Sequence, residues 1–376
     1  MSKQSVIIIG AGAAGLMAAK ELSSSFDVTV LEAQDHVGGR IHSIIEQDSV
    51  IEAGAEFIHG NLPVTLGLLQ KAGIPYEKVS GRMYRKKKNQ FQPVEEMAEG
   101  WDELIEKMKG IKQDITMQEL LDKYYDAPRY ELLRKHVKSY VEGFDIADLS
   151  RVSVQSLYQE WNAEEEDIYR IPKGYSSLIE WLQKKAEGSG CVIQLETMVQ
   201  KVDWQQGTVT VHASNDQKYT AAKLLVTVPV SVLQQPACKA YIHFNPSLHF
   251  DENIARQIGF GAVIKVIIKF RKTFWQNDAG FILSDETVPT WWTQLPNEKP
   301  LLTGWLGGPK AKELSNETDE VMLNKALSSL ASIYDMPIVE LKKEVEWSRI
   351  FNWQKSEYAM GAYSYPTLQT GLHGSK

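Results

Sequence analysis

The sequence has little cysteine, no long apolar run and no excess of basic residues, and each absence excludes a class of protein. Its 376 residues include only Cys191 and Cys238, which lack a C-x-x-C spacing, so neither a disulfide framework nor a zinc site is predicted. No apolar stretch is long enough to span a bilayer. The formal net charge of −7 argues against a nucleic-acid partner, because phosphate binding requires a basic face. We therefore expect a cytoplasmic protein without nucleic-acid, membrane or metal partners.

What is present is the composition of a large folded chain, with 43% apolar and 24% charged residues. A chain of this length exceeds one small core, so two domains are expected. Strand-like blocks at residues 5–9, 27–32 and 191–230 alternate with a helical block at 94–182, and 259–270 is again typical of a strand. These interleaved blocks predict an α/β fold whose chain crosses between two domains more than once.

The N-terminal segment carries a dinucleotide-binding pattern. After the buried strand, Gly10-x-Gly12-x-x-Gly15 permits a tight turn, close approach of the backbone to a pyrophosphate, and close packing of the following helix. Glu32 ends the next strand, where a carboxylate can accept hydrogen bonds from a ribose diol. The alternative is a small-residue turn in an unrelated α/β domain, but the strand, the helix and the acid are all in register. The pattern predicts a dinucleotide site without identifying the dinucleotide.

A second glycine pair, Gly38 and Gly39, is followed by Arg40 in DHVGGRIHS. Just beyond the ribose acid, this loop can bring backbone N–H groups and a fixed cation to the pyrophosphate. An ordinary surface turn is the alternative. We favour the phosphate role because a nicotinamide site usually needs the first loop alone.

These motifs resemble those of the flavin amine oxidases, which include the monoamine and polyamine oxidases. The likeness rests on VIIIGAGAAGLMAAKEL, VTVLEAQDHVGGRIHS and EAGAEFIHG, and continues through IPKGYSSLIEWL, VTVPVSVL, GAVIKVIIKFRKTFW and NWQKSEYAMGAYSYP. It covers nearly the whole chain and is weakest in the helical block. The resemblance implies an α/β fold in which a Rossmann-like FAD-binding domain (1–78, 175–245 and 356–376) is interleaved with a substrate domain of helices over a mixed β-sheet (79–174 and 246–355).

The resemblance also implies where FAD would bind. Val199 matches the position that meets the adenine through its backbone, residues 54–57 would run past the flavin ring, and Trp353 would lie near it. Ala362 stands where the monoamine branch carries a flavin-bonded cysteine, so the FAD is expected to be non-covalent. The implied cofactor-binding residues are Gly10, Gly12, Gly15, Glu32, Ala33, Gly39, Arg40, Gly54, Ala55, Glu56, Phe57, Val199 and Trp353.

Lys265 matches the family lysine that reaches the flavin N5 atom through a water, which makes it the implied catalytic residue. It is a charge among apolar residues in GAVIKVIIKF, and Lys269 shares its face by the two-residue period of a strand. A buried lysine is costly and often functional. From the pattern alone, a buried functional lysine and a half-exposed strand with both lysines on its solvent-facing side are equally good explanations. The family resemblance favours the functional lysine.

Tyr363 matches one wall of the aromatic cage around the amine, and Tyr365 points the same way in a Tyr-Ser-Tyr strand. An aromatic face suits an amine cation on approach, whereas the pattern alone favours ordinary packing. His59 is the second implied substrate residue, because EFIHG resembles the polyamine-oxidase branch more than the monoamine one. A structural, hydrogen-bonded histidine is the commoner case. Glu56 adds a carboxylate that could pair with a substrate ammonium.

The implied reaction is oxidation of an amine C–N bond to an imine, with O2 reduced to H2O2. The expected partners are thus a small-molecule amine and O2, while the particular amine and the oligomeric state stay open. Another flavin reaction on the same scaffold is one alternative. Amino-acid oxidation would need an Arg to clamp a carboxylate, and desaturation of a lipid-like substrate would favour an apolar docking face; neither feature can be placed.

A non-catalytic or partner-complemented FAD-binding subunit is the other alternative. Family members continue past the tyrosine-containing strand with a Gly-Glu or Gly-Thr motif that closes over the flavin, and the sequence has none. This departure leads us to expect weak or absent FAD retention.

Two charge runs are interpreted as solvated structure rather than as partner sites. RKKK at residues 85–88 is expected at a hairpin tip or in a loop. EEED at 164–167 is expected in a loop, although it could border a mouth that attracts cationic amines.

Overall fold

The computed structural model describes residues 3–87, 90–94, 98–163, 167–248 and 252–371, and the chain forms two compact units. The first unit is made of Met1–Lys78, Glu166–Arg256 and Ser356–Met360. The second is made of Val79–Glu165, Gln257–Lys355 and Gly361–Lys376. Strands and helices alternate in both, and the predicted α/β class with interleaved segments is confirmed.

The two units differ in their bounds from the expected domains. The switch after residue 78 is the same, but the middle segment of the first unit begins at Glu166 rather than 175 and ends at Arg256 rather than 245. Residues 361–371 pack with the second unit, because the N–H of Gly261 donates to the carbonyl of Tyr363 and the N–H of Ala362 donates to the carbonyl of Gly261, both at 2.9 Å. Residues 372–376 lie outside the described part. Which unit binds which ligand stays a prediction.

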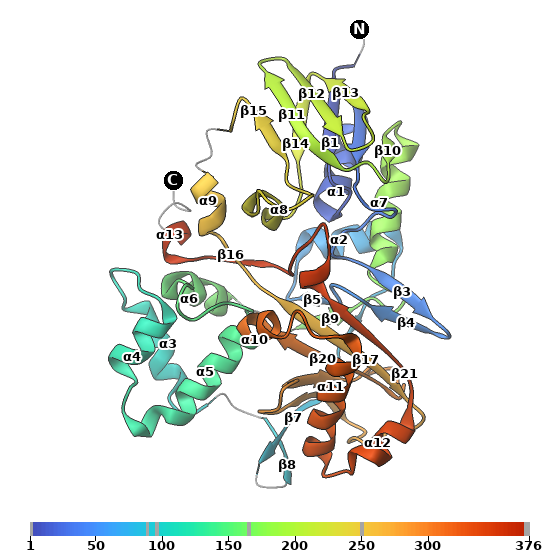
Figure 1. The fold of residues 1–376 in the computed structure, drawn as a ribbon. Coiled ribbons are helices and arrows are strands. Elements are labelled where there is room, and N and C mark those ends of the chain that lie inside the picture. The colour runs from blue at the N-terminus through green and yellow to red at the C-terminus, as the bar shows by residue number, and fades with distance from the viewer. Residues whose placement is uncertain (1–2, 88–89, 95–97, 164–166, 249–251, 372–376) are drawn as a thin grey trace. The chain divides into compact units, whose positions relative to one another are not determined.

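A four-stranded parallel sheet, in the order β10-β2-β1-β14, forms the centre of the first unit (Figure 1). Its strands are β1 (Ser5–Ile9), β2 (Asp27–Leu31), β10 (Val192–Gln194) and β14 (Lys223–Val226). Ile8 and Val30 on one face pack with the helices α1 (Ala13–Leu22) and α7 (Ser176–Gly188). Ile7 and Leu31 on the other face pack with a second sheet. Because both faces of β1 are buried, its sequence is continuously apolar.

The second sheet of the first unit has the order β13-β12-β11-β15, with β15 parallel to β11 and the other pairs antiparallel. Its strands are β11 (Val199–Gln205), β12 (Thr208–Ala213), β13 (Lys218–Ala221) and β15 (His243–Asn245). Smaller elements complete the unit: β3 (Ser43–Glu46), β4 (Ser49–Glu52), β5 (Phe57–His59), α2 (Pro63–Ala72), β6 (Glu77–Lys78), β9 (Ile168–Arg170), α8 (Val230–Gln234) and α9 (Glu252–Gln257).

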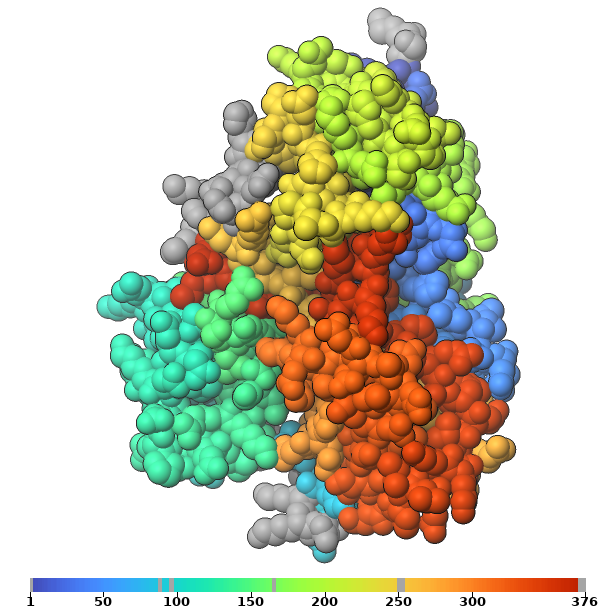
Figure 2. All heavy atoms as spheres, viewed as in Figure 1, coloured from blue at the N-terminus to red at the C-terminus, as the bar shows by residue number. Residues whose placement is uncertain are grey.

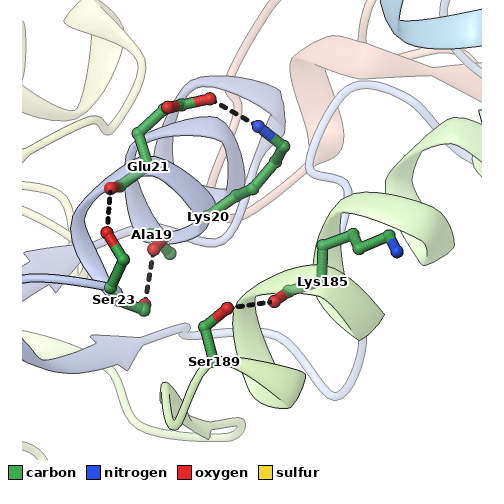
Figure 3. Close-up of polar contacts among 7 residues, drawn as sticks. Ala19, Lys20, Glu21, Ser23, Lys185 and Ser189 are labelled. Atoms are coloured by element: carbon green, nitrogen blue, oxygen red, sulfur yellow. Dashed lines mark hydrogen bonds and ion pairs between the residues drawn. The ribbon is translucent and has the colours of Figure 1, made fainter. Parts of the chain in front are cut away.

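The helices α1 and α7 pack against each other and end in the same way (Figure 3). The hydroxyl of Ser23 donates to the carbonyl of Ala19, and the hydroxyl of Ser189 donates to the carbonyl of Lys185 at 3.1 Å. These bonds satisfy carbonyls in the last turn that have no partner within the helix. Both helices are thereby closed at the end away from the glycine-rich turn.

A seven-stranded mixed sheet, in the order β21-β17-β20-β19-β18-β7-β8, organises the second unit. Helices α10 (Gly308–Glu313), α11 (Asp319–Tyr334) and α12 (Ile338–Glu344) pack with one face, where Ile264, Val266 and Ile268 of β17 are fully buried. The opposite face carries Lys265 and Lys269. The strands are β7 (Arg82–Lys87), β8 (Gln90–Pro93), β17 (Val263–Phe270), β18 (Ala279–Leu283), β19 (Thr290–Trp292), β20 (Leu301–Gly307) and β21 (Val345–Asn352).

A helical block with its own apolar core belongs to the same unit and appears in teal and green in Figure 2. It consists of α3 (Trp101–Lys109), α4 (Met117–Tyr124), the 3-10 helix η1 (Pro128–Tyr130), α5 (Glu131–Gly143) and α6 (Val154–Ala163). Tyr365 joins this core from the short strand β22 (Ser364–Tyr365), which pairs with β16 (Gly259–Phe260). The remaining elements are the 3-10 helix η2 (Trp353–Lys355) and α13 (Leu368–Gly371).

The charge runs have ion-pair partners where they are described. Arg85 and Lys86 lie near the end of β7, which forms a hairpin with β8, in agreement with the expected hairpin, and Lys86 pairs with Asp335 at 2.7 Å. Lys88 and residues 164–166 lie outside the described part, and Asp167 pairs with Lys78 at 2.5 Å. Among the described helices, none is long and apolar enough to cross a membrane.

Candidate cofactor and amine site

The turn between β1 and α1 has a conformation that requires its glycines. Gly10 has φ +100°, a left-handed conformation that disfavours other residues. A Cβ on Gly15 would lie 1.9 Å from the carbonyl oxygen of Gly10, so only glycine permits this packing of α1 on the turn. At Gly12 a Cβ would meet no atom nearer than 3.9 Å, and Ala13 and Ala14 are exposed. The first turn of α1 is therefore open to a ligand, and its N–H groups are aimed at it.

Glu32 lies at the end of β2 beside this turn and is 6% exposed. Its Oε2 accepts the N–H of Ala11 at 2.6 Å, and its Oε1 accepts the N–H of Gln34 at 2.9 Å. A carboxylate has about four acceptor positions, so two remain for the hydroxyls of a ribose. Ala33 follows directly and is half-buried.

The second glycine loop lies against the first. The N–H of Gly38 donates to the carbonyl of Ala11 at 2.9 Å, and Gly12 and Gly38 form a parallel β-bridge. Gly39 has φ +60°, and a Cβ there would lie 3.6 Å from the Cα of Gly12. The two loops that the sequence assigned to phosphate binding are thus adjacent in space. Arg40 follows them, and burial lowers the pKa of its guanidinium from the ordinary value.

The segment 54–57 continues from this second loop. The N–H of Ala55 donates to the carbonyl of Arg40 at 3.0 Å, while Gly54 is half-buried and Ala55 is exposed. Glu56 is buried in an ion pair with Arg170, with 2.9 Å between Oε1 and Nη2. The guanidinium of Arg170 also lies over the ring of Phe57, 5.1 Å from its centroid. The carboxylate of Glu56 therefore already faces a cation of this unit.

Val199 is brought to the ribose acid by its own strand. Two residues earlier, the N–H of Thr197 donates to the carbonyl of Glu32 at 2.7 Å, and the N–H of Glu196 donates to the carbonyl of Gln34 at 2.9 Å. Val199 itself is 4% exposed in the core between the two sheets. His59, by contrast, is exposed at the end of β5, where it lies opposite Ile168 of β9.

In the second unit, Lys265 is 1% exposed, which excludes a wet strand face. Its register partners are Trp305 on β20 and Phe351 on β21. Its Nζ lies 5.3 Å from the centroid of the Trp292 ring, and the rings of Trp292 and Trp305 are 6.0 Å apart. The ammonium thus lies against a corner of two indoles on the face of the sheet opposite the helices α11 and α12.

Trp353 and Tyr363 belong to the same unit as Lys265. Trp353 begins the 3-10 helix η2 directly after β21, two residues beyond Phe351, the register partner of Lys265. Tyr363 is 39% exposed, but its hydroxyl lies inside and donates to the carbonyl of Phe144.

Burial, followed by the charges of Asp145 and Glu160, raises the pKa of the Tyr363 phenol above its ordinary value. The phenol therefore stays protonated and keeps its donor hydrogen. Tyr365, expected beside it, is only 7% exposed among the helices and forms core instead.

Comparison with known proteins decides the family. The family of flavin-containing amine oxidoreductases matches residues 13–374 of the chain. The chain belongs to this family. The matched region begins in α1, just after the turn of Gly10 and Gly12, and includes the lysine-bearing sheet of the second unit.

The chain is similar to curated relatives of two kinds. Lysine-specific histone demethylase 2 of Homo sapiens is 31% identical over 73% of this chain and 35% of its own length. Lysine-specific histone demethylase 1B of Mus musculus is 26% identical over 96% of this chain and 47% of its own. Polyamine oxidase 2 of Arabidopsis thaliana is 25% identical over 96% and 78%. The chain spans less than half the length of the two demethylases.

Solved amine oxidases share the fold of this chain. A putrescine oxidase bound to putrescine has a TM-score of 0.80 at 20% identity, covering 99% of this chain and 89% of its own. Cyclohexylamine oxidase from Brevibacterium oxydans IH-35A has a TM-score of 0.80 at 19% identity, covering 98% and 90%. Their likeness supports the two-unit α/β architecture.

The flavin that this family binds fits the residues of the first unit. Three features meet there: a turn that only glycine permits, an open helix N-terminus, and a carboxylate with spare acceptors. Sequence reasoning missed three residues: Arg170, which pairs with Glu56 in the first unit, and Trp292 and Trp305, which lie near Lys265 in the second. None of the three belongs to a recognisable motif. The only available signal for the two tryptophans was the expected pairing of neighbouring strands around Lys265.

Proposed function

We propose that the chain binds FAD non-covalently and oxidises the C–N bond of an amine to an imine, with O2 reduced to H2O2. The observation that carries this proposal is the position of Lys265, a lysine with 1% exposure beside two indole rings in a member of the flavin-containing amine oxidoreductases. A cation in such a place is costly to bury, so a structural role alone is a poor explanation of it.

The cofactor would be held by the first unit. The N-terminus of α1 and the loop of Gly38 and Gly39 would face the pyrophosphate, and Arg40 would supply the cation. Glu32 would accept the ribose hydroxyls, and the backbone near Val199 would meet the adenine. The attachment would be non-covalent, because Ala362 stands where the monoamine branch carries its flavin-bonded cysteine.

The amine would be handled by the second unit. An alkyl amine has a pKa near that of lysine and is mostly protonated at pH 7. An apolar, aromatic surface disfavours the charged form, so binding there would release a proton and provide the neutral amine that oxidation requires. Trp292, Trp305 and the ring of Tyr363 offer such a surface.

Bound flavin would supply the two-electron acceptor for this chemistry. The amine loses two electrons and two protons to become the imine, which water then hydrolyses, and O2 takes up the two electrons and two protons as H2O2. Lys265 would hold a water at the reacting carbon by donating a hydrogen bond to it. Its neighbour Ile267 and the buried sheet around it would keep other water out.

Two amine classes are suggested by the relatives. The polyamine oxidases are named for free polyamines, and the histone demethylases for methylated lysine side chains. The exposed His59 follows the pattern EFIHG, which resembles the polyamine branch. Glu56 is less suited to a substrate ammonium than its sequence suggested, because Arg170 faces it. We favour a small alkyl di- or polyamine.

The test is a visible spectrum and a peroxide assay. The purified chain is incubated with FAD, desalted, and scanned between 300 and 500 nm, then supplied with mono-, di- and polyamines and with a dimethyl-lysine peptide. We expect weakly held flavin that is lost on acid precipitation, together with peroxide from the alkyl amines while FAD is in excess. Retained flavin with no turnover of any amine would instead favour another flavin reaction or a non-catalytic subunit.

A further inference from the structure

The exit of α5 makes unusual contacts with the lysine-bearing sheet. The last carbonyls of a helix have no partner within it and must be satisfied from outside. At this helix the earlier ones bind main-chain N–H groups: the carbonyl of Tyr140 accepts the N–H of Phe144 at 2.8 Å, and that of Val141 accepts the N–H of Ala147 at 2.9 Å. The later ones bind side chains of distant segments.

Two consecutive carbonyls hold two aromatic side chains. The carbonyl of Gly143 accepts the indole N–H of Trp305 at 2.7 Å, and the carbonyl of Phe144 accepts the hydroxyl of Tyr363. Trp305 comes from β20, where it is the register partner of Lys265. Tyr363 comes from the segment just before β22. Two adjacent peptide groups thus hold Trp305 and Tyr363, which are separated from them in the sequence by 162 and 219 positions.

The backbone at this exit is strained and tightly enclosed. Ile146 has φ +50°, which is rare for a β-branched residue and persists only where the surroundings enforce it. A Cβ on Gly307 would lie 2.7 Å from the carbonyl oxygen of Gly143, and one on Gly308 would lie 2.2 Å from that of Glu142. A Cβ on Gly261 would lie 2.4 Å from the side chain of Ile146. The glycines let β17 and β20 approach the exit closely enough for the two side-chain bonds.

We infer that the exit of α5, residues 143–146, is a positioning element for the amine site, and that Trp305 is a wall residue beside Lys265 that limits the size of the amine. This inference rests on the proposed function for the role of the wall, but not for the linkage of the two aromatic residues. Trp305 and Tyr363 act as a pair because one short turn sets the orientation of both rings.

The linkage is tested without turnover, by exchange of the indole proton of Trp305 in the ¹⁵N-labelled chain. The Trp305→Phe variant assigns its signal among the ten tryptophans. Tyr363→Phe keeps the ring and removes only the hydroxyl that binds the turn. We expect this variant to speed exchange at Trp305 by at least about tenfold, the change that a loosened hydrogen bond produces in local opening. Unchanged exchange would overturn the linkage.

Trp347→Phe is the matched control. Within the described residues, its buried indole nitrogen has no hydrogen-bond partner, so the same chemical change removes no bond. Exchange at Trp305 should be the same in this control as in the unaltered chain. Accelerated exchange in both variants would show a general loosening of the sheet and would also overturn the linkage.

The wall is tested by kinetics with amines of increasing N-substituent size. Trp305→Phe and Tyr363→Phe should each raise KM severalfold with a smaller change in kcat, and the double variant should be little worse than either alone, because either change loosens the same turn. Trp305→Ala should raise kcat/KM for the bulkiest amine relative to the smallest. An unchanged size preference would overturn the wall, whereas no turnover by the unaltered chain would refute the proposed function and leave the exchange result standing.

Discussion

Arg170 and Glu56 form a buried ion pair, with 2.9 Å between Nη2 and Oε1 and side-chain exposures of 7% and 5%. The pair is set by the register of β5 and β9, in which Phe57 lies opposite Arg170. The two residues are 114 positions apart in the sequence. The pair therefore joins two of the three segments of the first unit.

Removing Arg170 should destabilise the first unit strongly. Arg170→Met leaves the carboxylate of Glu56 buried without this cation and should lower the free energy of unfolding by about 3–5 kcal/mol. The double variant Glu56→Gln/Arg170→Met removes the stranded charge and should lose less than Arg170→Met alone. Urea unfolding of the single and double variants measures this coupling, and a double variant equal to the sum of the two single effects would contradict it.

Gly15→Ala should prevent flavin binding at the β1–α1 turn. The added methyl group would lie 1.9 Å from the carbonyl oxygen of Gly10, so α1 must move away from β1. We expect the FAD affinity to fall by at least about tenfold. We also expect a lower Tm, because overpacking destabilises a protein by about 1–3 kcal/mol. Gly67→Ala in α2 is the matched control, because its Cβ would meet no atom within 4 Å. Equal FAD affinity in both variants, measured by fluorescence titration, would refute the role of this turn.

Lys265→Met should depress turnover while leaving the fold intact. Methionine fills the buried volume but cannot bind a water, so kcat should fall by about 10²-fold, as for loss of a positioned polar group. Lys269→Met is the matched control, since Lys269 lies on the same strand and face at 9% exposure, beside Trp347 rather than Trp305. Steady-state peroxide release measures both variants. Similar rates in the two would remove Lys265 from the mechanism, provided that circular dichroism shows both folded.

Asp203 should contribute stability only above acid pH. Hydrogen bonds from Lys201, then Asn245 and His212, lower its pKa to about 2 from the model-peptide value near 3.9. A carboxyl whose pKa is depressed in the folded state stabilises above its unfolded pKa and loses this contribution as pH falls through the folded one. The stability difference between the unaltered chain and Asp203→Asn should therefore shrink from about pH 4 to about pH 2. Lys201→Gln should reproduce part of this pH-dependent loss of stability. A stability difference between the unaltered chain and Asp203→Asn that does not depend on pH would contradict the lowered pKa of Asp203.

The glycine turn could be predicted because its physics is local. A buried strand, a tight turn and a helix start lie within residues 5–22, and each requirement shows directly in the residue type. For Lys265, the two-residue period of β17 placed it on one face with Lys269 but left open whether that face was wet, and only the family resemblance favoured a functional role. At the glycine turn, by contrast, the neighbours in sequence are the neighbours that decide the environment.

The partners of these residues could not be predicted, because they come from distant segments. Arg170 meets Glu56 only through strand register, and Trp305 meets Lys265 in the same way. The burial of Tyr365 was missed because the alternation of side chains in a two-residue strand does not show what packs on each face. One face of this strand packs against the core of the helical block. The unit with which residues 361–371 pack could not be predicted for the same reason: a short strand can pair with either neighbour, and its pairing with β16 decides.

The interleaving of the two units constrains how the chain folds during synthesis. β1 pairs with β14, and Val6 lies opposite Lys223. The central sheet of the first unit is therefore incomplete until residue 223 has been synthesised. The intervening segment from Val79 to Glu165 belongs to the second unit, whose remaining segments begin only at Gln257. Neither unit can close on the ribosome before most of the chain has emerged. Until then the edge of β1 that pairs with β14 stays unpaired, and such non-local pairing is expected to slow folding and to expose this edge to aggregation.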